Sequence, residues 1–331
     1  MKRSRNSSSE TRRARTPMTQ PTAPRRLPTA LGVLAILLWS TTIGCLRFLT
    51  AALGTFTTAA TVYTLAGVLG CMVLALRRGA LRRVLALPKA YLFGCGALCV
   101  LCIAGLNTAI GFSNGNQQVV EISVVNYLWP ALTLFLSVPI LGRKARPWLA
   151  LGVILSLAGV FLALQQGTRT TWAGFAERFA DRPGPYLFAL TGALAWALYS
   201  TLSRRVGGDS GAMPLFLLAA GLLLGLVRLT VKESATWSWK VVPALVYAAV
   251  CPSLLAYSFW DLAMRKGRIV LLAALSYLIP ILSVAFTCLL LSVQPKWTLW
   301  AACVLVVAGA VISKLSISDP FPSPPSESDD G

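Results

Sequence analysis

The chain has 331 residues, of which 56% are hydrophobic and only 12% are charged. A soluble domain carries roughly 25% charged residues, so a soluble fold of this length would lack the charge needed to cover its surface. The chain contains no His, which removes the commonest metal ligand and general base. These features argue against an ordinary soluble enzyme and favour lipid as the surrounding solvent.

Both ends of the chain have the composition of disordered segments. Residues 1–28 are rich in Arg, Ser, Thr and Pro, and eight of the 30 Lys and Arg lie in the first 26 residues. An organellar transit peptide has a similar composition, but no convincing small-residue cleavage site follows. We therefore predict a disordered basic cytoplasmic tail over 1–28 and a second disordered cytoplasmic tail over 317–331.

Ten apolar runs follow the basic tail, and each is about as long as a helix that crosses a bilayer. The predicted spans lie near residues 30–50, 57–76, 91–111, 119–141, 147–165, 185–204, 212–230, 241–263, 269–292 and 297–315. The longest gap, 166–184, falls midway and is predicted as a connecting loop on the outside. It separates five helices over 29–165 from five over 185–316.

The basic residues predict the orientation of the spans. If the N-terminus lies inside, 22 of the 30 Lys and Arg face the cytoplasm and seven face outside, with Arg47 in the first span. This bias follows the positive-inside rule, and an even number of spans returns the C-terminus to the cytoplasm. The net charge of +19 is thus attributed to anionic lipid, and no nucleic acid partner is expected.

The two halves resemble one another in sequence. The Trp39 and Arg47 pair is repeated by Trp196 and Arg204 at an offset of 157 residues. At an offset of 150, Tyr-Leu-Trp-Pro at 127–130 matches Tyr-Leu-Ile-Pro at 277–280, and Ala158-Gly159 matches Ala308-Gly309. With five spans per half, the second half must enter the membrane from the opposite side. The predicted fold is an all-α polytopic membrane protein of ten transmembrane helices in two inverted five-helix repeats, an arrangement typical of secondary transporters.

Proline occupies equivalent positions in the fourth and ninth spans, at Pro130 and Pro280. Each proline removes a backbone donor, frees the carbonyl one turn earlier and permits a bend. We predict that the two prolines are helix pivots. Glycines of the fifth and tenth spans, such as Gly152, Gly159 and Gly309, are predicted to pack helices closely, either within the chain or against a second copy.

Three charged residues lie where lipid would not tolerate them. Charged groups at membrane depth are costly and normally face a cavity or a partner. Arg47 and Glu121 are both expected near the outer ends of their spans, where a salt bridge or gate between them competes with contact with interfacial water. Asp261 lies near the inner end of the eighth span, close to Arg265, and an ion pair between them is expected rather than contact with a substrate.

Uncharged polar and aromatic residues gather in matching spans of the two halves. For each one alone, helix packing is the better explanation. As a set, they predict an aromatic-walled cavity with amide and hydroxyl groups. The candidate substrate-binding residues are Trp39, Ser40, Thr41, Asn107, Glu121, Asn126, Tyr127, Trp129, Trp196, Tyr199, Tyr257, Trp260, Ser276 and Tyr277.

The eight cysteines all fall inside apolar runs and are interpreted as small apolar helix residues. Cys99 and Cys102 have CxxC spacing, but no second pair or loop accompanies them. We expect no metal site, no catalytic residue and no cofactor.

Two motifs make the chain similar to a known family. Leu-Leu-Trp-Ser-Thr-Thr-Ile-Gly at 37–44 and Val-Val-Glu-Ile-Ser-Val-Val-Asn-Tyr-Leu-Trp-Pro at 119–130, with ten spans and inverted halves, resemble the drug/metabolite transporter superfamily and its EamA-like members. Within it, the chain resembles the bacterial YddG-type aromatic amino acid exporters. The resemblance covers about residues 28–316.

The resemblance implies export of aromatic and other neutral amino acids across the bacterial inner membrane by alternating access. An amino acid needs groups for its two charges and an apolar wall for its side chain. The ammonium group would meet Glu121 or the carbonyls freed by proline. The carboxylate would be held by Asn126, Ser40 and Thr41. The ring would lie against Trp39, Tyr127 and Trp129.

Other functions stay open at this stage. The same fold serves exporters or importers of other metabolites or drugs. An intramembrane enzyme is disfavoured because His is absent and the buried acids are isolated, and a channel because no charge ring or carbonyl filter motif is found. Proton coupling would need a buried titratable group, for which Glu121 is the candidate. The oligomeric state stays open, with a monomer among the options.

Overall fold

The computed structural model describes residues 26–164, 172–208, 211–290 and 297–318. The two predicted tails lie mostly outside these ranges, as does part of the connecting loop. The first part of the chain forms α1 (Arg26–Ser40), α2 (Thr42–Leu53), α3 (Thr55–Leu76), α4 (Ala80–Leu85), a π-helical turn η1 (Ala90–Cys95), α5 (Gly96–Gly111), α6 (Gly115–Asn126), α7 (Trp129–Leu141), β1 (Lys144–Ala145) and α8 (Trp148–Leu164).

The second part repeats this helical character. It forms α9 (Trp172–Asp181), α10 (Pro183–Val206), α11 (Met213–Thr230), a 3₁₀ turn η2 (Trp239–Val241), α12 (Val242–Ala248), a π-helical turn η3 (Ala249–Leu255), α13 (Ala256–Lys266), α14 (Ile269–Leu275), a 3₁₀ turn η4 (Ser276–Leu278), α15 (Ile279–Leu290), α16 (Trp297–Ser316) and β2 (Ile317–Ser318). The only strands among the described residues, β1 and β2, form a short antiparallel pair in which Lys144 opposes Ser318.

The helices have the length and apolarity of membrane spans. In the described ranges, eight helices qualify, or nine if Arg26–Ser40 and Cys45–Leu53, which meet at 49°, form one bent span. Helix α8 is apolar but has only 17 residues. Since lipid cannot satisfy backbone hydrogen bonds, a chain this apolar must form helices in a bilayer. The chain is therefore a polytopic helical membrane protein, and the predicted count of ten spans is matched only in part.

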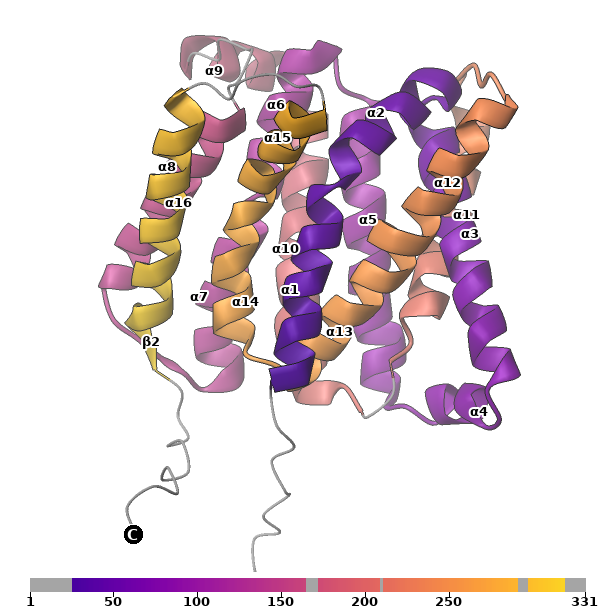
Figure 1. Cartoon of the computed structure of the whole chain (residues 1–331), viewed down its shortest axis with the longest axis horizontal. Helices are drawn as coiled ribbons and strands as arrows, with labels where there is room; N and C mark the ends of the chain where they lie inside the picture. The colour runs from indigo at the N-terminus through magenta and orange to yellow at the C-terminus, as the bar shows by residue number, and fades with distance from the viewer. Residues whose placement is uncertain (1–25, 165–171, 209–210, 291–296, 319–331) are drawn as a thin grey trace, which may run out of the picture.

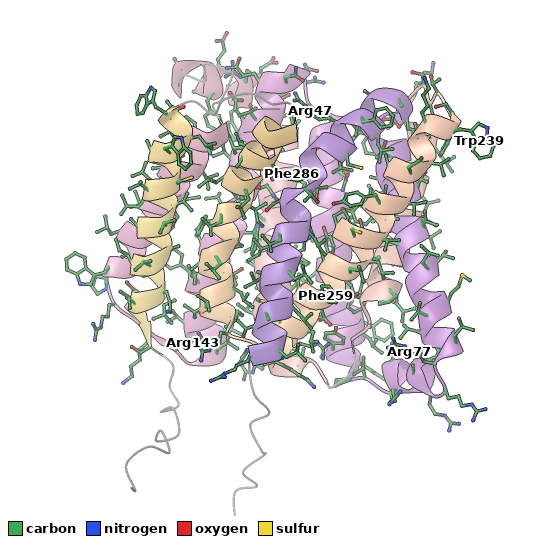
Figure 2. All side chains as sticks on the ribbon, viewed as in Figure 1. Arg47, Arg77, Arg143, Trp239, Phe259 and Phe286 are labelled. Carbon is green, nitrogen blue, oxygen red and sulfur yellow. The ribbon has the colours of Figure 1, made fainter. Side chains whose placement is uncertain are left out.

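The two ends of the helix bundle differ in what covers them (Figure 1). We call the lower end the one where α1 begins and where α4 and the β1–β2 pair lie, and the upper end the one where α2 and α9 lie. The arginines Arg77 and Arg143 lie at the lower end, whereas Arg47 and Trp239 lie at the upper end (Figure 2). Both described chain ends, the start of α1 and β2, are at the lower end.

Glycines bring helices from the first part against helices from the second. A Cβ added at Gly67 of α3 would lie 2.4 Å from the backbone nitrogen of Leu218 in α11. A Cβ at Gly309 of α16 would lie 2.5 Å from the carbonyl oxygen of Gly152 in α8, and one at Gly105 of α5 would lie 2.9 Å from a carbonyl oxygen of α10. Such close approaches are typical of membrane helix pairs. The predicted close packing at Gly152 and Gly309 is confirmed, and it occurs within the chain.

Two spans are broken at equivalent points. Helix α6 ends at Asn126, a turn over Tyr127 and Leu128 follows, and Pro130 is the second residue of α7. Helix α14 likewise gives way to the η4 turn, and Pro280 is the second residue of α15. Proline is tolerated in the first turn of a helix because its missing N–H would have no partner there. The prolines thus begin new helices after each break, and their role as pivots stays a prediction.

A carboxylate holds the upper end of α3. Glu233 accepts hydrogen bonds from the backbone N–H groups of Phe56 (3.1 Å) and Thr57 (2.8 Å) and lies 3.4 Å from Arg228. The free N–H groups at a helix N-terminus favour an anion at this place. Gly54 has a φ of 81°, and a Cβ there would lie 2.1 Å from the Glu233 carboxyl carbon, so only glycine leaves room for this cap.

Helix α9 lies within the segment predicted as the outside connecting loop. It crosses the upper end of the bundle (Figure 1). Phe175 and Phe179 of α9 pack against Tyr186 of α10, with ring centroids 5.4 and 5.5 Å away. The described part of this connection is thus a helix anchored to the bundle.

Candidate functional site

Aromatic side chains from four helices meet in the bundle. Trp39 comes from α1, Trp129 from the start of α7, Trp196 from α10, and Tyr257 and Trp260 from α13. The Trp260 ring centroid lies 5.3 Å from that of Trp39 and 5.4 Å from that of Trp129, and the Trp39 and Trp196 centroids are 6.0 Å apart. Most of these pairs meet edge to face, the arrangement that ring quadrupoles favour. We call these five residues the aromatic cluster.

Hydrogen bonds fix the orientation of two rings in the aromatic cluster. The Trp39 indole N–H donates to the carbonyl oxygen of Pro252 (3.0 Å), and the Trp260 N–H donates to the Ser200 hydroxyl (3.2 Å). Trp260 is fully buried, whereas Trp39 is half-buried. A buried indole usually finds such a partner, and these hydrogen bonds hold the two rings in fixed orientations.

Two further tyrosines border the aromatic cluster. Tyr199 stacks on Trp196 at 5.0 Å, and Tyr63 of α3 lies edge-on to Tyr257 at 6.2 Å. Tyr63 is not among the predicted site residues. It is an aromatic residue in the middle of the second predicted span, so the criterion that selected the other aromatic residues would have found it.

The predicted hydroxyl and amide groups mostly bond to their own helices. Ser40 donates to the carbonyl oxygen of Ile36 (2.8 Å), Asn107 to that of Ile103 (2.8 Å) and Ser276 to that of Ala273 (2.7 Å). Such back-bonding lowers the cost of a polar side chain in a membrane helix. It occupies one donor in each group and leaves the oxygen atoms able to accept.

Thr41, which lies between α1 and α2, donates to the carbonyl oxygen of Leu38 in α1 at 2.8 Å, and its hydroxyl contacts that of Tyr247. Asn126 and Tyr127 lie half-buried at the break before α7. Tyr277 lies at the corresponding break in the ninth predicted span and is fully buried, and its hydroxyl has no hydrogen-bond partner in the described part of the chain. An unpaired buried hydroxyl is costly, so the Tyr277 hydroxyl would be stabilised by a hydrogen-bond partner.

Glu121 is engaged at the upper end and does not join the aromatic cluster. It is buried in α6, forms an ion pair with Arg178 of α9 and accepts a hydrogen bond from the Tyr186 hydroxyl (2.5 Å). That hydrogen bond network is strong enough to raise the pKa of Arg178, with the Glu121 hydrogen bond as the main cause. Eight residues separate Glu121 from Trp129, or about 12 Å along a helix.

The possible salt bridge between Arg47 and Glu121 is not formed. The Arg47 side chain is exposed at the upper end (Figure 2), and Arg178 takes the place beside Glu121. A guanidinium that reaches interfacial water keeps its hydration and pays little desolvation cost. This explains why Arg47 needs no acidic partner.

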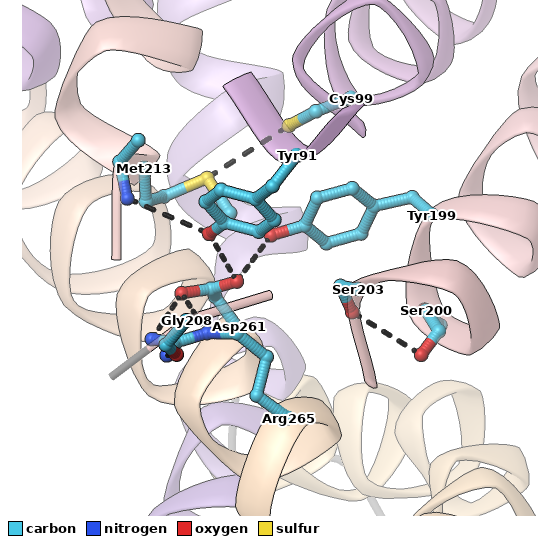
Figure 3. Close-up of polar contacts among 10 residues, drawn as sticks. Tyr91, Cys99, Tyr199, Ser200, Ser203, Gly208, Met213, Asp261 and Arg265 are labelled. Atoms are coloured by element: carbon cyan, nitrogen blue, oxygen red, sulfur yellow. Dashed lines mark hydrogen bonds and ion pairs between the residues drawn. The ribbon is translucent and has the colours of Figure 1, made fainter. Parts of the chain in front are cut away.

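Asp261 forms the expected ion pair with Arg265, with 2.8 Å between Oδ2 and Nη2. Its other oxygen, Oδ1, accepts hydrogen bonds from the hydroxyls of Tyr91 and Tyr199, both at 2.7 Å (Figure 3). The Tyr199 hydroxyl is thus bound to Asp261, although its ring borders the aromatic cluster. Tyr91 is not among the predicted site residues; a tyrosine at the start of a span is also typical of an interfacial belt.

The described residues offer no metal-binding group beside their apolar, hydrogen-bonding and ion-pair contacts. No group of three or more His, Cys, Asp or Glu among them could hold a metal ion, and the seven cysteines whose state is described are free. In the aromatic cluster, the rings pack mainly against one another.

A family model for EamA-like transporters matches residues 27–165 and 184–315. The chain belongs to the EamA-like transporter family. Its members form part of the drug/metabolite transporter superfamily, as the sequence motifs predicted. The chain is thus a multi-pass membrane transporter and not an enzyme.

Three similar proteins illustrate the family. The aromatic amino acid exporter YddG of Escherichia coli K12 is 29% identical over 88% of this chain and 98% of its own length. The protein of the same name from Ancylobacter novellus is 32% identical over 88% of this chain and 98% of its own length. A crystal structure of a protein that is 28% identical superimposes with a TM-score of 0.71 and covers 88% of this chain and 99% of that chain.

Proposed function

We propose that this transporter exports aromatic and other neutral amino acids across a bacterial inner membrane by alternating access of two inverted five-helix halves. The observation that carries the proposal is the aromatic cluster, which draws Trp39 and Trp129 from the first half and Trp196 and Trp260 from the second. A site built from both halves changes its exposure when the halves move.

Several features support ten spans in two inverted repeats. The helix pairs α1–α13, α5–α10, α3–α11, α7–α14 and α8–α16 each join one half to the other. A two-fold axis that relates the halves would place the α1–α13 pair on the α5–α10 pair. It would place each of the other three pairs on itself, with its two helices exchanged. The family match also falls into two stretches of similar length, and the breaks before Pro130 and Pro280 are equivalent.

The substrate class rests on the relatives and on the aromatic cluster together. The relatives from E. coli and A. novellus are named aromatic amino acid exporters. A ring packed edge to face against Trp39 and Trp260 would gain the same interactions that these rings make with one another. Apolar walls with few polar groups are typical of small-molecule sites.

The charges of an amino acid need partners at the helix breaks. Pro130 has no N–H to give to the carbonyl of Asn126, so this carbonyl is the group we assign to the ammonium. The corresponding carbonyl of Ser276 already accepts a hydrogen bond from the Ile279 N–H. The Asn126 amide and the Tyr277 hydroxyl are the donors we assign to the carboxylate. Glu121 is left out of this set because Arg178 and Tyr186 occupy its carboxylate.

We assign the lower end to the cytoplasm. This end carries Arg77 and Arg143 (Figure 2) and the exposed basic residues of α4. The excess of Lys and Arg on one side of a membrane protein marks the cytoplasmic face.

Counterflow of labelled tryptophan in proteoliposomes tests the function. We expect vesicles loaded with unlabelled phenylalanine or tryptophan to accumulate label transiently, and an acidic amino acid to compete poorly. Replacement Trp39→Ala should lower counterflow by about tenfold or more, because a half-buried wall of the site is lost. The matched control Trp239→Ala removes a tryptophan that is 89% exposed and should leave counterflow unchanged. Counterflow that a panel of aromatic amino acids fails to reduce would contradict the proposed substrate class.

A further inference from the structure

We propose that Tyr91, Tyr199 and Gly208 close the lower end of the transporter by binding the Asp261–Arg265 pair, and that this contact is the inner gate. The proposal rests on the alternating access described above. It assigns a gating role to residues that do not belong to the aromatic cluster. Arg265 lies near the end of α13, which reaches the lower end of the bundle (Figure 1).

The bonds of Asp261 connect two helix pairs that the repeat relates to each other. Asp261 belongs to α13, which packs against α1. Tyr91 belongs to η1 at the start of the third span, and Tyr199 belongs to α10, which packs against η1 and α5. Movement of one pair against the other is the motion expected of inverted repeats. The two hydroxyl bonds to Asp261 cross the boundary between these pairs.

The charges of the gate stay together when it opens. Asp261 and Arg265 are four residues apart on the same helix, so they move as one unit. The bonds that must break come from other elements: the two tyrosine hydroxyls and the carbonyl of Gly208, which accepts from Arg265 Nη1 at 2.5 Å. Water can replace these neutral partners at modest cost, whereas separating a buried ion pair would cost several kcal/mol.

Close packing seals the gate in this structure. The side chains of Asp261 and Arg265 are only 2% and 4% exposed. A Cβ at Gly211 would lie 2.6 Å from Asp261 Oδ2, and one at Gly207 would lie 2.4 Å from Arg265 Cδ. The backbone between α10 and α11 therefore lies directly against the ion pair at these two glycines. A pair this enclosed reaches water only if the surrounding elements separate.

Two native cysteines lie next to the gate and can report its opening. Cys95 is the last residue of η1, and Cys99 follows one turn later, with its thiol 3.8 Å from the Met213 sulfur. Both are buried. We would retain these two cysteines, replace the other six with Ala, and measure labelling by a charged methanethiosulfonate reagent in nanodiscs.

Replacement of either tyrosine by Phe removes one hydroxyl bond and keeps the ion pair. We expect Tyr91→Phe and Tyr199→Phe each to raise the labelling rate of Cys95 and Cys99 by about tenfold, the effect of a shift of about 1.4 kcal/mol in the equilibrium between closed and open forms. Tyr186→Phe is the matched control, because it removes the same kind of bond from a buried carboxylate at the upper end. It should not raise labelling of these cysteines.

Three results would overturn the proposal: unchanged labelling in both lower-end variants, an equal rise in the Tyr186→Phe control, or a rise that is accompanied by general unfolding in a thermal melt. Labelling is measured without substrate, so it does not depend on which molecule is transported. Absence of tryptophan counterflow together with the expected labelling pattern would reject the proposed substrate and keep the gate.

Discussion

Two buried carboxylates, one near each end of the bundle, differ in where their partners come from. Asp261 and Glu121 each bind an arginine and at least one tyrosine hydroxyl. Arg265 lies on the same helix as Asp261 and is 4% exposed, whereas Arg178 comes from α9 and is 33% exposed. The ion pair of Asp261 and Arg265 lies within α13, whereas that of Glu121 and Arg178 joins α6 to α9.

This difference determines which bonds can change during transport. At the lower end, neutral groups from other helices bind a pair that is already neutral as a whole. At the upper end, the charge pair is itself the contact between α9 and α6. Coulomb attraction in contact with water is weak and is screened by salt, while a buried pair is little affected. The two ends should therefore respond differently to the same perturbation.

The largest difference is expected when each carboxylate is neutralised. Asp261→Asn leaves the buried Arg265 without a counter-charge and should lower the free energy of unfolding by about 3–5 kcal/mol. Thermal melting in detergent measures the loss. The double variant Asp261→Asn with Arg265→Gln should recover part of it, because no buried charge then remains unpaired. A melting temperature unchanged in the single variant would show that Arg265 reaches water without Asp261.

Neutralising the upper carboxylate should cost less. Glu121→Gln removes the counter-charge of Arg178, but this guanidinium is partly exposed and is solvated by interfacial water. We expect a loss of about 1–2 kcal/mol, set mainly by the altered hydrogen bond to Tyr186. Hydrogen exchange should also become faster in α9 than in α13. A loss equal to that of Asp261→Asn would remove the distinction between the two ends.

The same comparison explains what the sequence could predict. Asp261 and Arg265 are one helical turn apart, so their pairing follows from spacing alone. Glu121 and Arg178 are separated by 57 positions, and only the folded chain brings them together. For Arg47, the sequence left a salt bridge with Glu121 and contact with interfacial water both open, because depth in a span says nothing about which neighbouring helix faces a side chain.

The aromatic cluster was more accessible to prediction than its polar surroundings. Aromatic residues in mid-span have few explanations in a membrane helix, so Trp39, Trp196 and Trp260 were selected correctly as neighbours. Hydroxyl groups such as that of Ser40 can bond to their own helix, and the sequence does not reveal which do. The π-helical turn that positions Tyr91 has no sequence signal comparable to the prolines.

The smallest expected effect separates the two ends without any substitution. Raising the salt concentration from 0.1 M to 1 M shortens the Debye length from about 10 Å to about 3 Å. The ion pair of Arg178 should then weaken by a few tenths of a kcal/mol, since exposed pairs contribute about 0–1 kcal/mol in total. Hydrogen exchange in α9 should quicken up to about twofold, while labelling of Cys95 and Cys99 at the lower end stays constant. A salt-dependent change in that labelling would mean that the lower gate opens by separating Asp261 from Arg265, and that charge, rather than tyrosine hydroxyls, holds the lower end closed.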